Sequence, residues 1–147
     1  MREQGLTTRL AASTTPAEQF SVWAMRLWWR GFPELDTAWP HLVAGFRRCG
    51  VQAIEACHRF CSTALAAAGC GYGIGCLHCP RLTPTEERLL AALASANFGV
   101  DEAELHLREV LPASAARMAA PHAVRLARAL SDSGLEWPTC ATSELLH

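Results

Sequence analysis

The sequence predicts an all-α protein, folded as a single-domain bundle of about five to six helices with a loop rich in glycine and cysteine. Two threonine–proline pairs, each followed by a glutamate, have the pattern of a helix start. After these pairs, apolar residues recur at helical spacing, and no convincing stretch alternates apolar and polar residues as a half-buried strand does. The 147 residues suffice for one domain with a hydrophobic core.

The helical domain is expected over residues 15–138. Residues 1–14 are polar and predict a flexible N-terminal arm, and residues 139–147 predict a flexible tail. Trp137 is the residue expected to anchor the segment that leads into this tail.

The first helix is predicted to begin at the capping box "TPAE", from Thr15 to Glu18, and to run to about Trp29. In such a box the threonine oxygen accepts a hydrogen bond from the third helical amide, while the glutamate reaches back to the first residue. Gly31 offers a left-handed stop, and Pro33 prevents the helix from resuming.

The next segment predicts a helix capped by Asp36 or Thr37, with an apolar pattern that resumes past Gly50. It is either one long helix loosened at Gly45 and Gly50 or two consecutive helices. The stretch "GCGYGIGCLHCP" follows within a loop at residues 69–81, where alternating glycines are expected to interrupt the helix.

A second capping box, "TPTE" from Thr83 to Glu86, predicts the clearest helix of the chain. This helix is expected to end at Asn97 or Gly99, and a short helix follows it. A last helix is predicted over residues 114–133, with Pro121 as a kink or a break near its middle.

The composition excludes several chemistries. The chain holds 13 basic and 14 acidic residues, and every basic residue is arginine. Without lysine, neither a Walker-A phosphate loop nor a lysine Schiff base can form. A protein that binds nucleic acid usually carries a basic surplus, so the near-neutral charge argues against a nucleic-acid partner.

The cysteine content predicts a cytoplasmic protein with reduced thiols. The chain has seven cysteines, an odd number, and its first twenty residues lack the continuous apolar segment of a secretion signal. A disulfide framework is therefore not expected. Residues 60–80 have about the length of a membrane span, but their glycines make a poor continuous helix, so a membrane-spanning segment is not expected either.

The loop carries the local chemistry that the sequence indicates most directly. Cys76 and Cys79 form a C-x2-C pair, a spacing at which two thiolates reach one metal ion from a turn. Cys70 precedes them, and Cys57 and Cys61 lie upstream at i and i+4 on one helical face. If the loop folds back onto that face, these cysteines can close a zinc site or hold an iron–sulfur cluster. All five are candidate metal ligands.

Two other interpretations of these cysteines stay open. Cys57 and Cys61 share an apolar face, on which cysteine behaves as a small buried residue. Cys76 and Cys79 can instead form a redox pair, although no βαβ pattern of the thioredoxin kind surrounds them. Haem attachment is excluded because proline follows the second cysteine, and the glycines match no dinucleotide-binding fingerprint.

The stretch "FSVWAMRLWWRGF", residues 20–32, combines tryptophan with arginine in the first helix. This combination is typical of binding surfaces and of interfacial helices. The alternative is that the aromatic residues pack into the core while the arginines extend to solvent. Since two of the tryptophans are neighbours, one of them is expected to face outward. The candidate partner-binding residues are Trp23, Arg26, Trp28, Trp29 and Arg30.

The run "CPRLTPTEERLLAALA" and the later "LARALSDSGLEWP" resemble a pattern in small uncharacterised helical proteins of GC-rich α-proteobacteria. In those proteins a cysteine-rich turn precedes an Arg-apolar-Thr-x-x-Glu helix start. The likeness extends from about residue 20 to residue 138. It implies a bacterial origin and a helical fold, and no mechanism, because the family has no established activity. The matching positions are Cys79, Arg81, Leu82, Thr83 and Glu86.

The sequence shows no complete catalytic set, since its histidines are scattered and nothing orients a base beside a cysteine. We therefore expect a non-enzymatic, partner-binding or regulatory protein that binds another protein or associates with itself. The alternative is a protein that binds zinc or an iron–sulfur cluster through the cysteine-rich loop.

Overall fold

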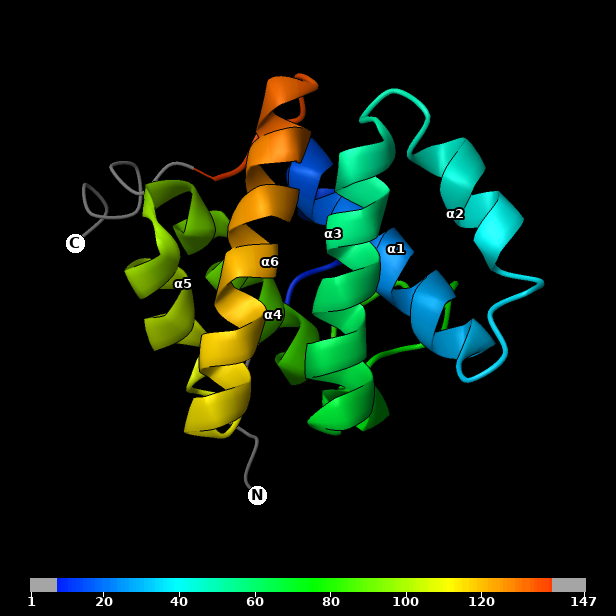
Figure 1. Ribbon diagram of the computed structural model, residues 1–147. Helices are drawn as coiled ribbons and strands as arrows, with labels where there is room; N and C mark the ends of the chain where they lie inside the picture. Colours follow the sequence, from blue (N-terminus) through cyan, green and yellow to red (C-terminus); the bar gives the residue numbers. More distant parts are fainter. Residues whose placement is uncertain (1–7, 139–147) are drawn as a thin grey trace.

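The computed structural model describes residues 8–138, which form six α-helices and no β-strand (Figure 1). The prediction of an all-α bundle is confirmed. None of the helices in this part of the chain is long and apolar enough to cross a membrane. In chain order the helices are α1 (Pro16–Gly31), α2 (Trp39–Gly45), α3 (Val51–Cys61), α4 (Pro84–Ser95), α5 (Val100–Leu107) and α6 (Ala113–Asp132).

Helices α3 and α6 lie side by side at the centre of the bundle (Figure 1). Most residues that α6 buries are alanine, and α3 buries Ala53 and Ala56, so the two helices can approach closely. Helix α5 packs against both α4 and α6, whereas α2 lies at the edge of the molecule against α1 (Figure 1). The core is therefore shared by α1, α3, α4, α5 and α6, and α2 packs at its edge against α1.

Helix α1 begins at the predicted capping box. The Glu18 N–H donates to Thr15 Oγ1 at 3.4 Å, and the Thr15 N–H donates to Glu18 Oε1 at 2.9 Å. The expected left-handed stop at Gly31 is wrong, because Gly31 is the last helical residue and has no positive φ. A Cβ atom there would lie 2.7 Å from the Cβ of Ala38, so close packing explains this glycine.

The segment after α1 forms two helices rather than one. Ala38 lies at the N-cap of α2, so neither Asp36 nor Thr37 caps it as predicted. Gly50 precedes α3 with a φ of +94°, a conformation that favours glycine. Helix α3 continues as a π-helical turn over Ser62–Ala67, which leads into the cysteine-rich loop.

The second capping box is confirmed at the start of α4. The Glu86 N–H donates to Thr83 Oγ1 at 3.0 Å, and the Thr83 N–H donates to Glu86 Oε1 at 2.8 Å. Helix α4 ends in a 3-10 turn at Ala96–Phe98, and Gly99, with a φ of +133°, separates this turn from α5. The predicted end at Asn97 or Gly99 therefore falls within this 3-10 turn or directly after it.

Helix α6 is not broken at Pro121 but continues through it as one α-helix. Gly134 has a φ of +93° and follows directly after the last turn, where its conformation ends the helix. The Trp137 indole N–H donates to the carbonyl oxygen of Ala127 at 3.2 Å. Trp137 therefore anchors the segment after α6, as predicted.

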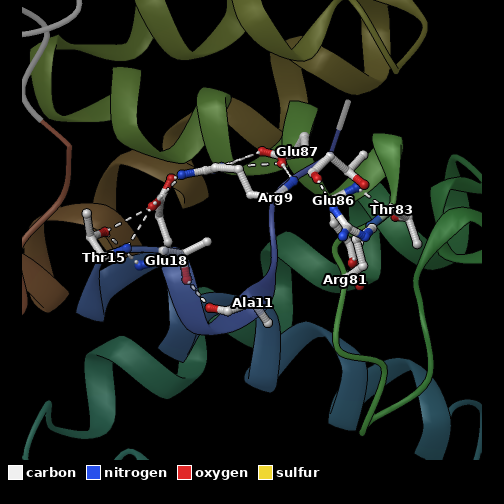
Figure 2. A network of polar contacts seen from close by, with 10 residues as sticks. Arg9, Ala11, Thr15, Glu18, Arg81, Thr83, Glu86 and Glu87 are labelled. Atoms are coloured by element: carbon white, nitrogen blue, oxygen red, sulfur yellow. Dashed lines mark hydrogen bonds and ion pairs between the residues drawn. The ribbon is translucent and has the colours of Figure 1, made fainter. Parts of the chain in front are cut away.

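Residues 8–14 pack against the bundle, which corrects the prediction of a flexible arm up to residue 14. The Arg9 guanidinium lies between the carboxylates of Glu18 in α1 and Glu87 in α4 (Figure 2). Its Nη2 atom is 2.9 Å from Glu18 and 2.8 Å from Glu87. The arginine thus fastens the N-terminal segment across the starts of two helices. The remainder of the predicted arm and tail lies outside the described residues, at 1–7 and 139–147.

Candidate functional site

A buried ion pair joins α1 to α4. Arg26 Nε lies 2.7 Å from Glu86 Oε2, and Arg26 Nη2 lies 2.9 Å from Glu86 Oε1, so the guanidinium and the carboxylate meet through two parallel bonds. The two side chains are 3 % and 0 % exposed. Hydrogen bonding to Glu86 raises the pKa of Arg26, against the opposing effect of burial. Both charged groups are shielded from water, and the attraction between them offsets the cost of removing each from water.

The burial of Arg26 corrects its assignment to a partner-binding surface, and it also corrects the alternative in which this arginine extends to solvent. The reason is Glu86. Its carboxylate serves the capping box of α4 from inside the core, where an unpaired charge is costly. The arginine of α1 supplies the compensating charge.

The same ion pair holds the second half of the cysteine-rich loop. Arg26 Nη1 donates to the carbonyl oxygen of Cys79 at 2.8 Å, and Nη2 donates to that of Arg81 at 3.2 Å. From the loop, the Gly75 N–H donates to Glu86 Oε2 at 3.0 Å. The backbone is therefore bonded to the buried charges on both sides of the C-x2-C pair.

Two glycines allow the first half of the loop to lie close to the helices. A Cβ atom on Gly71 would overlap the indole ring of Trp29, and one on Gly73 would overlap the side chain of Thr85. Thr83 Oγ1 also donates to the carbonyl oxygen of Gly73 at 2.6 Å. The alternating glycines therefore do more than interrupt a helix, because they let the loop backbone pack against α1 and α4.

Cys76 and Cys79 flank a reverse turn in this loop. The Cys79 N–H donates to the carbonyl oxygen of Cys76 at 3.2 Å. Cys76 is exposed, and Cys79 is half-buried. The pKa of Cys76 is lowered, first by hydrogen bonding from the Cys79 thiol and then by the N–H groups of His78 and Cys79 and the charge of Arg26. The same contact between the thiols raises the pKa of Cys79.

The other candidate metal ligands lie elsewhere. Cys57 and Cys61 are buried in α3 with their sulfur atoms 4.0 Å apart, and burial raises the pKa of Cys61. Cys70 donates to a backbone carbonyl oxygen 3.4 Å away. Over residues 8–138, no three cysteine, histidine, aspartate or glutamate side chains gather into a group that could hold a metal ion. The zinc or iron–sulfur site stays a prediction, and elemental analysis of protein purified without oxygen tests it.

Three adjoining hollows surround the turn between the two cysteines, with volumes of about 660, 440 and 300 Å³. Leu77, in the turn itself, lines all three hollows. Trp23 lines the first and third, and Arg30 lines the first and second. His41 of α2 lines the largest hollow. Of the residues that the structure describes, no aspartate or glutamate lines any of the three.

The tryptophans of α1 divide between the core and this surface. Trp28 is 1 % exposed, and its indole N–H donates to His58 Nδ1 at 3.0 Å. Its assignment to a partner-binding surface is therefore corrected. Its neighbour Trp29 is half-buried and lines the second hollow, as expected if one of the two faces outward. Trp23, Trp29 and Arg30 remain candidate surface residues.

Leu77 and His41 were not predicted as site residues. Leu77 had no clear signal in the sequence, because a single leucine in a surface turn is common. His41 had no signal either, since its position in the hollow depends on how α2 lies against α1.

Comparison of the chain with protein-family models, with curated proteins and with solved structures finds no match. The resemblance to helical proteins of α-proteobacteria, which rests on Cys79, Thr83 and Glu86 among others, stays a prediction.

Proposed function

We propose that the protein binds a partner protein at the surface around Leu77, through a segment of that partner that carries both apolar and acidic side chains. The observation that carries this proposal is the set of three adjoining hollows, with an apolar and cationic lining and no carboxylate from the described residues. An open set of hollows suits a segment with several side chains better than one compact small molecule, which an enclosed pocket would bury.

The apolar part of the lining supports side-chain burial. Trp23, Trp29 and Leu77 offer two aromatic rings and an aliphatic side chain around the same turn. Aromatic residues and arginine are the types on which binding energy concentrates in protein interfaces. The loop that presents Leu77 is bonded to a buried ion pair, so little ordering is needed when a partner binds.

The cationic part of the lining supports an acidic partner. Arg30 is exposed and forms no ion pair within residues 8–138, so its guanidinium is free to bind a carboxylate. His41 lies across the same hollow, on α2. This binding role is non-enzymatic, and we propose that the protein is cytoplasmic. Its six described cysteines are all free thiols, as the reducing cytoplasm favours.

Isothermal titration with a short acetylated peptide, in which leucine and glutamate alternate, tests the proposal. Arg30→Glu is expected to weaken binding about tenfold, because a hydrogen bond to a charged group is worth about 1.5 kcal/mol. Arg88→Glu makes the same charge reversal at an exposed position of α4 and should leave the affinity unchanged. Equal affinity for the two variants, or equal binding of a peptide with glutamine in place of glutamate, would contradict the proposal.

A further inference from the structure

The two cysteines of the surface turn differ from the other described thiols. Cys57 and Cys61 also face each other, but both are buried in α3. Cys76 is the exposed cysteine among the six that the structure describes, and a second cysteine, Cys79, lies across a hydrogen-bonded turn from it. Access to solvent and a neighbouring thiol coincide only at this pair of the described residues.

We propose that Cys76 and Cys79 form a dithiol–disulfide exchange site whose substrate is a small anionic disulfide. The geometry of the turn supports this. The hydrogen bond from the Cys79 N–H to the Cys76 carbonyl oxygen closes the turn, so the ends that carry the thiols stay together. The bonds from Arg26 to the Cys79 carbonyl and from Gly75 to Glu86 hold the backbone on either side.

The two thiols have different environments, as exchange requires. Cys76 is exposed and lines the hollow beside the turn, so it is the attacking sulfur. Cys79 is half-buried, so it is the resolving sulfur. The order of attack follows from this difference in access.

In the first step, the Cys76 thiolate forms a bond to one sulfur of the substrate disulfide, and the other substrate sulfur leaves as a thiolate that takes a proton from water. In the second step, Cys79 releases its proton to water and its thiolate attacks the Cys76 sulfur, which expels the first substrate sulfur as a thiolate that takes a proton from water. Two thiols of the protein are oxidised to one disulfide, and one substrate disulfide is reduced to two thiols.

The hollow beside Cys76 indicates the charge of the substrate. It has a volume of about 440 Å³ and is lined by Arg26, Arg30 and His78, together with Cys76, apolar residues and no carboxylate from the described part of the chain. A disulfide that carries carboxylates, such as glutathione disulfide, is attracted here, whereas the dication cystamine is not. The charge of Arg30 should therefore favour glutathione disulfide over cystamine.

The test treats reduced protein with glutathione disulfide in the absence of oxygen and maps the products by mass spectrometry. The wild-type protein should acquire a disulfide between Cys76 and Cys79. Cys79→Ser should stop at a mixed disulfide of Cys76 with glutathione, and Cys76→Ser should lower the rate of thiol oxidation about tenfold or more. Cys49→Ser removes a half-buried cysteine outside the pair and should behave as wild type. Far-UV circular dichroism checks that each serine variant is folded.

The preference for an anionic substrate has its own readout, the ratio of the rates with glutathione disulfide and with cystamine. Arg30→Glu should lower this ratio, and Arg88→Glu should leave it unchanged. The proposal is overturned if wild-type protein forms no Cys76–Cys79 disulfide, or if glutathione attaches mainly to other cysteines. It is also overturned if the purified chain holds stoichiometric zinc that blocks both thiols. None of these outcomes depends on whether a partner protein binds.

Discussion

Removing one charge of the buried ion pair between Arg26 and Glu86 leaves the other charge unpaired in the core. Glu86→Gln keeps a carbonyl oxygen for the capping box but removes the negative charge, while Arg26→Met keeps an unbranched apolar side chain of similar length. Arg26→Met also removes the bonds to the carbonyl oxygens of Cys79 and Arg81. We expect both variants to be strongly destabilised, because both side chains are almost fully buried, at 3 % and 0 % exposure.

The size of the expected loss of stability follows from the burial of these two charges. Breaking a buried ion pair from one side costs about 3–5 kcal/mol, a large part of the roughly 5–15 kcal/mol that stabilises a single domain. With a urea m-value of about 2 kcal/mol per molar, the unfolding midpoint should fall by roughly 2 M. The double variant, Arg26→Met with Glu86→Gln, buries no charge, so its cost should fall short of the sum by about 2 kcal/mol.

Urea unfolding followed by tryptophan fluorescence measures these changes, since Trp28 is buried in the native state. The matched control is the ion pair of Arg59 with Glu55 on α3, at 3.3 Å and about half exposed at 55 % and 54 %. Arg59→Met and Glu55→Gln should each cost less than about 1 kcal/mol. If the variants at the buried pair cost no more than these controls, or if their effects add in the double variant, the two charges do not act as a unit.

Three smaller changes test the contacts around this pair. Thr83→Ala should cost about 1 kcal/mol in urea unfolding for the lost cap, and more than Thr15→Ala, because Thr83 also holds the loop; equal costs would argue against that second role. Gly71→Ala should lower the midpoint as its methyl group displaces an indole ring of α1, and an unchanged midpoint would contradict this packing. Hydrogen bonds from Arg9 lower the pKa of Glu87 below its ordinary 4.5 despite burial. Their stabilisation is present above pH 4.5 and lost as the pH falls through the lower, folded value. Glu87→Gln should therefore flatten the acid dependence of the midpoint, and an unchanged slope would contradict the contribution of Arg9.

The helices that begin with local chemistry were predictable from the sequence. Thr15 and Thr83 open α1 and α4 because a capping box is completed within a few residues. Asp36 and Thr37 are good capping types, yet the helix begins later, at Trp39, after Ala38. A sequence lists residues able to cap, but packing decides which of them does.

The site was predictable only in part, because its main contact is long-range. Arg26 and Glu86 are 60 residues apart, and nothing near Arg26 in the sequence distinguishes it from an arginine that extends to solvent. The C-x2-C pair could be recognised in the sequence, and the sequence also predicted that one of two neighbouring tryptophans faces outward. Which of the two tryptophans faces outward was not predictable, because Trp28 is held inside by its hydrogen bond to His58 in α3.

The most direct test of the proposed binding surface is an NMR titration of labelled protein with the peptide of alternating leucine and glutamate. We expect the largest shift changes at the Leu77 amide and at the indole N–H groups of Trp23 and Trp29, with little change at the buried indole of Trp28. Arg30→Glu should reduce these changes. Shifts that are absent, or that centre on α5 and α6, would contradict the assignment of this surface.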